Sequence, residues 1–254
     1  VRRGAHEDGA EMSDQIVVDG DSLSSYLGPP AFTTERIWER TPVGVVMGLA
    51  WTSMGGSTLY VEASVVDEGE GKGSITTTGS LGDVMKESAL IAFACARDCL
   101  RRRDPESDFF QTSRVHIHVP AGATPKDGPS AGTAMATAIV SLMTGIPVRK
   151  EVAMTGEVTL RGRVLPIGGL KEKLLAAMRG GITKVLIPKD NEKDLTEVPD
   201  NIRAGLEIVP VENMDEVLSH ALQNLPVAIE WDEDAYYASR EIARVDDPEA
   251  SQPH

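Results

Sequence analysis

The residues Thr124 to Gly132, TPKDGPSAG, carry a serine where the chain passes from a constrained loop into an apolar helix. Pro125 and Pro129 restrict the loop, and Gly128 allows close approach of the backbone. The first turn of a helix has unpaired N–H groups and a partial positive charge, which can stabilise an oxyanion. Ser130 is therefore a candidate nucleophile. A serine that only caps the helix is the alternative interpretation.

A nucleophilic serine needs a proton acceptor, and histidine and lysine are both available. His116 and His118 lie on the polar face of a predicted strand, where solvent-facing or hydrogen-bonded histidines are the alternative. A lysine acts as a base only if burial lowers its pKa from about 10.4 to about 7–8, which requires a dry site. The predicted helix 170–179 carries Lys171 and Lys173 on opposite edges of its apolar stripe. Periodicity does not choose between these two lysines.

The elements that must position these residues follow from the apolar patterning. Predicted helices cover 82–100, 130–144, 170–179 and 214–223. Predicted strands cover 43–51, 57–66, 114–119, 151–160, 163–169, 183–188 and 205–211, with turns at 53–57 and 69–73 and a connection at 108–111. Strands and helices mix without a strict βαβ alternation, so the pattern favours an α+β fold.

The composition limits the class of partner. The 254 residues carry 25 Lys and Arg against 39 Asp and Glu, and the net charge of −14 argues against nucleic acid or an anionic membrane as the main partner. A local basic patch at Arg101–Arg103 stays compatible with that charge. The longest unbroken apolar run, Ala89–Ala96, has eight residues, whereas a membrane-spanning helix needs about 20.

No motif predicts a metal or a nucleotide in this chain. The sequence has no G-x-x-x-x-G-K-[ST] loop, no H-E-x-x-H and no Cys/His set at metal-binding spacing. Cys95 and Cys99 are four residues apart on one face of a predicted helix, which favours small buried side chains in a reduced compartment.

Two long motifs, TPKDGPSAG at 124–132 and VAMTGEVTLRGRVLPIGGLKEKLLAA at 152–177, closely resemble the proteolytic domain of the ATP-dependent Lon proteases of bacteria and mitochondria. The stretches VDGDSLSSYLG, TGSLGDVMKES and VHIHVP extend the resemblance over residues 20 to 225. It implies the α+β fold of that family, with mixed sheets and packed helices, in the ribosomal-protein-like superfamily. It also implies the end of an ATPase module and a linker in 1–30 and the proteolytic domain in 31–225. The acidic tail 226–254 has no counterpart in the family pattern.

The resemblance implies that the site is a Ser-Lys dyad. Ser130 matches the nucleophile, and Lys173, the second lysine of GGLKEK, matches the base, so the resemblance chooses Lys173 over Lys171. Thr155 matches a residue that hydrogen-bonds the lysine in the family. Asp127 lies in a loop that changes between occluding and open forms in the family, so it is expected to pair with Lys173 and silence it.

The implied function is that of a serine endopeptidase that degrades unfolded or damaged proteins as the proteolytic part of an ATP-dependent Lon protease. The expected partners are protein substrates, the ATPase module of the same full-length chain and further copies in a homohexamer. ATP and Mg²⁺ are expected at the ATPase module, and the location is expected to be cytoplasmic. One rival is a ring-forming structural base that becomes active only when it is joined to the ATPase module. The other rival, an inactive Lon-like binding module, disagrees with the presence of both dyad residues.

Overall fold

The computed structural model describes residues 19, 22–28, 38, 40–52, 55–68 and 73–227. The chain divides into two compact units, Val1–Ile37 and Trp38–His254. The first unit contains the short helix α1 (Leu23–Leu27), which is preceded by a hydrogen bond from the backbone N–H of Ser22 to the Asp19 carboxylate (2.8 Å). Most of the predicted turn at 69–73, part of the turn at 53–57 and the acidic tail beyond Val227 lie outside the described residues.

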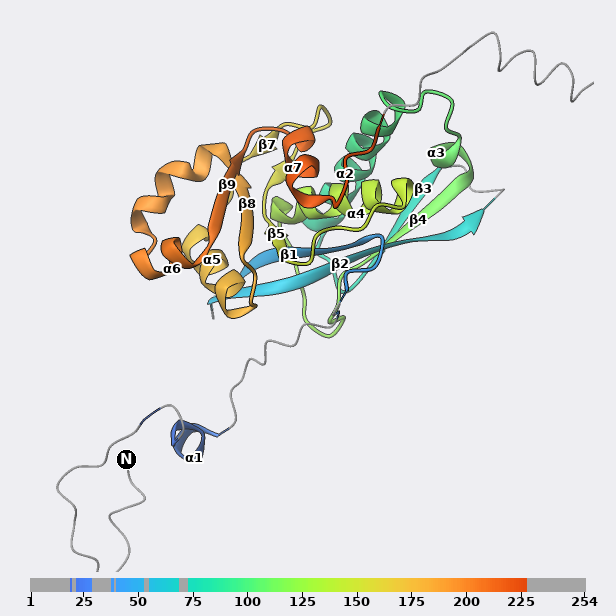
Figure 1. The fold of residues 1–254 in the computed structure, drawn as a ribbon. Coiled ribbons are helices and arrows are strands. Elements are labelled where there is room, and N and C mark those ends of the chain that lie inside the picture. The colour runs from blue at the N-terminus through green and yellow to red at the C-terminus, as the bar shows by residue number, and fades with distance from the viewer. Residues whose placement is uncertain are drawn as a thin grey trace, which may run out of the picture. The chain divides into compact units, whose positions relative to one another are not determined.

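A seven-stranded mixed sheet organises the second unit (Figure 1). Its strands lie in the order β3-β4-β2-β1-β5-β8-β9. The β1–β2 and β2–β4 pairs are antiparallel, and the other four neighbouring pairs are parallel. A mixed sheet with packed helices agrees with the fold class predicted from the sequence. The strands are β1 (Val45–Thr52), β2 (Gly55–Glu68), β3 (Ser74–Thr78), β4 (Ser113–His118), β5 (Val152–Met154), β8 (Lys184–Pro188) and β9 (Glu207–Val211), and a separate two-stranded sheet pairs β6 (Glu157–Val158) with β7 (Val164–Leu165).

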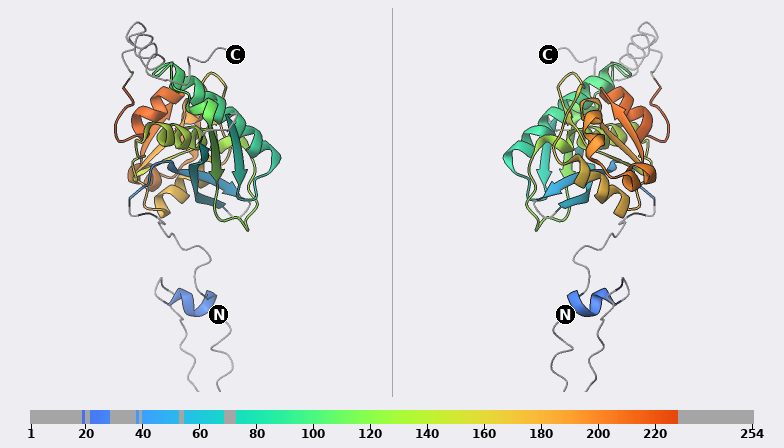
Figure 2. Two further views of the ribbon diagram at one scale, coloured as in Figure 1. Left: turned by 90° about the vertical axis from the view of Figure 1, so that its right-hand side faces the viewer. Right: turned by 90° about the vertical axis from the view of Figure 1, so that its left-hand side faces the viewer.

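Helices pack on both faces of the main sheet (Figures 1 and 2). Successive side chains of a strand point to opposite faces, and β1 shows the result. Val46 belongs to the hydrophobic cluster that includes α2, α4 and α7, whereas Met47 and Leu49 belong to the cluster that includes α5 and α6. The helices are α2 (Asp83–Arg101), α3 (Phe109–Thr112), α4 (Gly132–Thr144), α5 (Leu170–Arg179), α6 (Asp200–Gly205) and α7 (Met214–Ala221), with 3₁₀ helices at Pro129–Ala131 and Lys189–Glu197.

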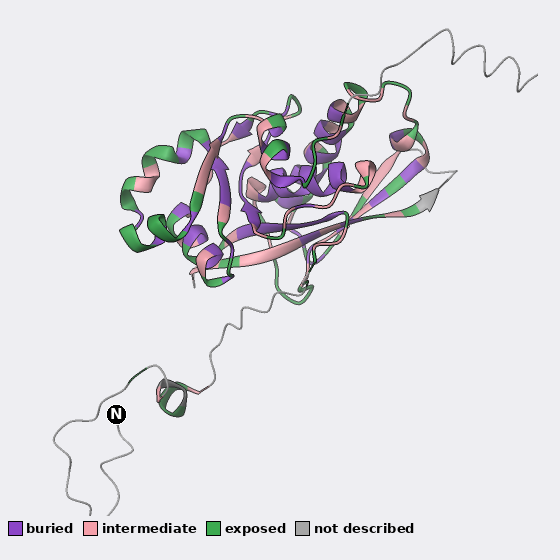
Figure 3. Cartoon of the chain, in the orientation of Figure 1, coloured by how far each residue is buried: buried purple, intermediate pink, exposed green. Residues whose placement is uncertain are grey.

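The four predicted long helices are present as α2, α4, α5 and α7. The helix α4 is the most enclosed of them, because every residue from Gly132 to Ser141 is buried (Figure 3). This agrees with its sequence, which is apolar nearly all round. None of the helices in the described part of the chain has the combination of length and hydropathy that crossing a membrane requires.

The prediction of one strand at 151–160 is wrong, because the segment forms two strands in different sheets. The chain leaves the main sheet after β5, where the N–H of Thr155 donates to Leu186 O (3.1 Å). The next N–H, of Gly156, donates to Ser130 O (2.9 Å), and β6 then begins the small sheet. The segment has strand-forming residues on both sides of the break, so its composition alone does not reveal the change of sheet.

The predicted connection at 108–111 is also wrong, since most of it lies in α3. The N–H groups of Gln111 and Thr112 both donate to Asp108 O, at 2.7 and 3.0 Å. Phe110 packs edge-on against Phe93 of α2, with ring centroids 4.9 Å apart. Four residues are too few for helical periodicity to appear in the sequence. The 3₁₀ helix at Lys189–Glu197 and the short helix α6 were not predicted.

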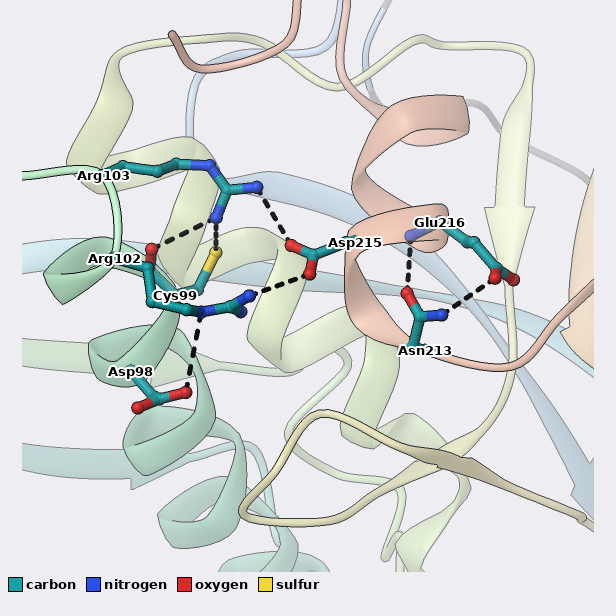
Figure 4. Close-up of polar contacts among 7 residues, drawn as sticks. All are labelled: Asp98, Cys99, Arg102, Arg103, Asn213, Asp215 and Glu216. Atoms are coloured by element: carbon teal, nitrogen blue, oxygen red, sulfur yellow. Dashed lines mark hydrogen bonds and ion pairs between the residues drawn. The ribbon is translucent and has the colours of Figure 1, made fainter. Parts of the chain in front are cut away.

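Polar contacts join the end of α2 to the start of α7 (Figure 4). The Asp215 carboxylate accepts hydrogen bonds from Arg102 (3.0 Å) and Arg103 (2.9 Å), so two arginines of the basic run are paired. Arg103 also donates to Cys99 Sγ (2.8 Å). Cys95 and Cys99 are free and buried, and burial raises the pKa of Cys95 to about 11. Their burial agrees with the interpretation as small buried side chains.

Candidate active site

Ser130 lies in the 3₁₀ turn Pro129–Ala131, which runs directly into α4. Gly128 precedes the turn with a φ of 111°, a left-handed conformation that favours glycine. Ser130 is partly buried, whereas Ala131 and the following residues of α4 are buried. The predicted junction between a constrained loop and a buried helix is therefore present at Ser130.

The break between β5 and β6 lies against this turn. The N–H of Gly156 donates to Ser130 O (2.9 Å), and the N–H of Thr133 donates to Gly156 O (3.0 Å). A Cβ at Gly156 would lie 2.8 Å from side-chain carbons of Thr133 and Val164, so a side chain has no room there. Sequence reasoning missed Gly156. The available signal was a glycine inside a strand pattern, which often marks close approach of another backbone.

Lys173 of α5 is buried, with 2% of its surface exposed. Its Nζ donates to Thr155 Oγ1 (2.9 Å), and no ion pair with a described residue balances its charge. Burial lowers the pKa of Lys173 from 10.5 to about 8, because desolvation disfavours the ammonium. Lys171, the alternative that periodicity left open, is exposed on the same helix. Of the two, only Lys173 has the dry environment that a lysine base requires.

Thr155 joins Lys173 to the nucleophile turn. Its Oγ1 accepts the hydrogen bond from Lys173 and donates to Ser130 O (3.3 Å). The hydroxyl of Ser130 itself forms no hydrogen bond to any described residue, Lys173 included. The structure thus brings Lys173, Thr155 and the main chain of Ser130 together. Contacts between a nucleophile and its base often tighten only when substrate is bound.

Asp127 is exposed, and its carboxylate binds backbone rather than Lys173. Its Oδ1 accepts hydrogen bonds from the N–H groups of Met85 (2.9 Å) and Gly128 (2.8 Å). Gly82, the N-cap residue of α2, has no side chain with which to cap the helix, so Asp127 caps it from the neighbouring loop. No ion pair between Asp127 and Lys173 occurs in the structure as described.

His116 and His118 lie on β4 with partners of their own. The Nε2 of His116 and the Nδ1 of His118 are 2.8 and 2.7 Å from Thr78 Oγ1. Together with Glu62 they border a cavity of about 420 Å³. Neither imidazole hydrogen-bonds Ser130 or Thr155, whereas Lys173 is connected to the main chain of Ser130 through Thr155, so the geometry of the described residues favours a lysine over a histidine as the base.

The arrangement supports acyl transfer. A partly buried serine lies in the turn that leads into α4, and a buried lysine of lowered pKa is connected to the main chain of this serine through Thr155. Across the described residues, no three His, Cys, Asp or Glu side chains gather in a group that could hold a metal ion.

Residues 17–224 match the family model described as the Lon protease (S16) C-terminal proteolytic domain. The chain belongs to this family. Lon proteins of family S16 are serine peptidases, and the matched range includes all four residues to which the sequence assigns roles: Asp127, Ser130, Thr155 and Lys173.

Individual Lon proteins are similar to this chain over most of its length. The Lon protease of Rhizobium meliloti (strain 1021) is 56% identical over 218 residues, which are 86% of this chain and 27% of that protein. The mitochondrial Lon protease homolog of Oryza sativa subsp. indica is 53% identical over 222 residues, 87% of this chain and 22% of that protein. Lon protease homolog 1, mitochondrial, of Arabidopsis thaliana is 54% identical over 208 residues, which are 82% of this chain and 22% of that protein. The chain therefore spans between 22% and 27% of the length of these curated Lon relatives.

Proposed function

We propose that this chain is the proteolytic part of an ATP-dependent Lon protease and that it hydrolyses peptide bonds in unfolded or damaged proteins. The observation that carries the proposal is the state of Lys173, a buried lysine whose pKa is lowered to about 8 and whose Nζ has a hydroxyl as its partner. Such an amine is neutral in about one molecule in ten at pH 7, which is enough to act as a base.

In the proposed reaction Ser130 Oγ attacks the carbonyl carbon of the scissile bond, and Lys173 Nζ accepts the hydroxyl proton. Backbone N–H groups around Ser130 stabilise the oxyanion of the tetrahedral intermediate. The C–N bond then breaks, the Lys173 ammonium returns the proton to the leaving amine, and an ester on Ser130 remains. Water attacks this ester with Lys173 again as base, which releases the carboxylic acid and restores the Ser130 hydroxyl.

Thr155 holds the lysine in this scheme. Its hydroxyl accepts a hydrogen bond from the ammonium and can donate one to the neutral amine, so Lys173 keeps a partner in both protonation states. Ser130 Oγ and Lys173 Nζ have to come within hydrogen-bond distance before the reaction, because no hydrogen bond joins the two side chains among the described residues.

That missing hydrogen bond also favours a second candidate function, a ring-forming base that becomes competent only when assembled. In this second candidate function, six copies of the chain form a closed ring joined to the ATPase module, and assembly brings the Ser130 hydroxyl to Lys173. The two candidates differ in one measurement. Activity that rises faster than linearly with protein concentration supports assembly, and a fully active monomer contradicts it.

The remaining partners follow from the proposed role. Protein substrates are implied by membership of the Lon family. We propose that ATP and Mg²⁺ act at the ATPase module of the full-length chain and that the protein works in the cytoplasm, where Cys95 and Cys99 remain reduced.

The test is degradation of an unfolded protein such as casein by the chain without ATP, beside three variants. Ser130→Ala and Lys173→Ala should both abolish cleavage, and Lys171→Ala, on the exposed side of the same helix, should leave it unchanged. Cleavage that survives Ser130→Ala would contradict the proposal. If the isolated chain does not cleave, the same variants are compared in the full-length protease with ATP.

A further inference from the structure

A second lysine lies four residues before the candidate nucleophile, and its contacts are of another kind. The Nζ of Lys126 donates hydrogen bonds to three backbone carbonyls, those of Gly79 (2.7 Å), Ala121 (2.7 Å) and Thr124 (2.8 Å). An ammonium has three protons and accepts no hydrogen bond, so these contacts use all of its donors. Lys126 forms no ion pair with a carboxylate of the described residues.

The three carbonyls come from two segments of the chain. Ala121 and Thr124 belong to the loop that leads from β4 to Ser130, whereas Gly79 belongs to the connection between β3 and α2. The ammonium therefore closes the loop 121–126 on itself and fastens it to the neighbouring connection.

The main chain of Lys126 also forms hydrogen bonds with the connection between β3 and α2. Its N–H donates to Ser80 O (3.0 Å), and its carbonyl accepts from the N–H of Gly82 (2.7 Å). Residue 126 is thus held to the β3–α2 connection by both its side chain and its main chain, just before α2 begins.

From this point to the nucleophile the loop runs along the first turns of α2. Asp127 caps the helix by accepting the N–H of Met85 (2.9 Å), and Ser88 Oγ donates to Pro129 O (3.3 Å). Ser130 is the next residue, and its carbonyl is held from the other side by Gly156. A change in the position of residue 126 would therefore move Ser130 through the three residues between them, which lie along α2.

We propose that Lys126 is a positioning residue for Ser130. Its ammonium fixes where the chain enters the 3₁₀ turn, and so fixes where the Ser130 hydroxyl starts its approach to the substrate carbonyl and to Lys173. The inference rests on the proposed peptidase function, and it assigns Lys126 no contact with substrate. Small displacements of a reacting group, of the order of 1 Å, cost about 100-fold in rate, so the placement of this loop matters for turnover.

The first variant is Lys126→Met, which keeps the length and apolar stem of the side chain and removes the three donors. The full chain should show a fall in kcat of about tenfold or more on a fluorogenic peptide, with KM changed by no more than about twofold, because Lys126 is assigned no contact with substrate. Lys86→Met is the matched control. Lys86 is an exposed lysine of α2 whose described contact is an ion pair with Asp83. Loss of this ion pair should change neither kcat nor KM.

Restoring a cation at position 126 by other means tests whether the ammonium, rather than the rest of the lysine side chain, is required for kcat. Lys126→Arg keeps a cation with several donors and should retain kcat within about threefold. Lys126→Cys should behave as Lys126→Met, and alkylation with 2-bromoethylamine, which restores an ammonium at nearly the same reach, should return most of the lost kcat. The unmodified chain treated in the same way controls for the other two cysteines, which are buried.

An unchanged kcat in Lys126→Met would overturn the inference, and so would a loss of kcat that neither arginine nor the alkylated cysteine restores. A loss of kcat that only matches the fraction of unfolded protein in a thermal melt would overturn it as well. Ser130→Ala in the same assay keeps the two hypotheses apart. If Ser130→Ala still cleaves the peptide, the proposed peptidase function fails. If Ser130→Ala is inactive and Lys126→Met has an unchanged kcat, the positioning role alone fails.

Discussion

Lys173 and Lys126 are both connected to the Ser130 turn, and they differ in what accepts their hydrogen bonds. Lys173 meets one hydroxyl, that of Thr155, and Lys126 meets three carbonyls. Burial lowers the pKa of both lysines. A hydroxyl can donate as well as accept, so it remains a partner when the lysine loses a proton, but a carbonyl cannot. The type of partner, in addition to burial, therefore decides whether a lysine suits proton transfer or the fixing of a loop.

The sharpest test of this comparison is the same substitution at both positions. Lys173→Arg should lower kcat/KM on a peptide by about 1,000-fold, because a guanidinium does not lose its proton in proteins and cannot act as the base. Lys126→Arg should remain within about threefold, since positioning requires only donors. Equal losses at the two positions would contradict the division of roles.

Removal of the charge should also change the stability of the folded chain by different amounts at the two positions. Lys173 has a lower pKa in the folded chain (about 8) than its ordinary 10.5, so the folded state binds its proton less tightly than the unfolded state does. Below pH 8 the lysine is charged in both states and its burial costs about 3 kcal/mol, and this cost disappears as the pH rises from 8 to 10.5.

Lys173→Met should therefore raise the free energy of unfolding by about 3 kcal/mol at pH 7, and the gain should fall below about 1 kcal/mol at pH 10. Lys126→Met should give no such gain, because three carbonyls lose their partner. Urea unfolding at pH 7 and pH 10 measures both differences. A Lys173→Met chain that is less stable than the parent at pH 7 would count against the lowered pKa.

The pH dependence of turnover should belong to Lys173 alone. The neutral amine is the active form, so kcat/KM should rise with pH up to about 8, and it should fall about tenfold for each unit below that value. Lys126→Arg should keep this rise at the same pH. A profile that is flat between pH 6 and 8 would remove Lys173 from the role of base.

The smallest effect is expected at Thr155, which orients the lysine without exchanging protons in the reaction. Thr155→Val removes the hydroxyl that contacts Lys173 Nζ and Ser130 O and should lower kcat about tenfold. Thr155→Ser retains the hydroxyl and serves as the control, with kcat within about threefold of the parent. Similar losses in both variants would indicate that packing of the threonine methyl, rather than the hydrogen bond, matters here.

Sequence patterns predicted the elements whose signal is local. The helix 170–179 was predicted with the bounds that α5 has, because an apolar stripe begins after one pair of glycines and ends before another. Periodicity could not separate Lys171 from Lys173, since both flank the stripe and only the packing of α5 against the sheet buries one of them. The resemblance to the Lon family supplied that choice.

The features that the patterns missed depend on contacts between distant segments. The break at Thr155 and Gly156 is set by hydrogen bonds to Leu186 and Ser130, which are far away in the sequence. Lys126 was not singled out for a role, because its partners are backbone carbonyls, which every residue possesses. A residue whose partners are main-chain atoms leaves no pairing in the sequence for pattern reasoning to detect.

The carbonyl partners of Lys126 also determine how the loop 121–126 can change over evolutionary time. Substitution of Ala121 or Thr124 leaves the carbonyl of that residue in place, so side chains in this loop can vary without loss of the contact. Insertion or deletion of a single residue, in contrast, moves the carbonyls away from the ammonium. The loop should therefore be tolerant of new side chains and intolerant of new lengths, with position 126 itself as the one place where a point mutation removes all three hydrogen bonds.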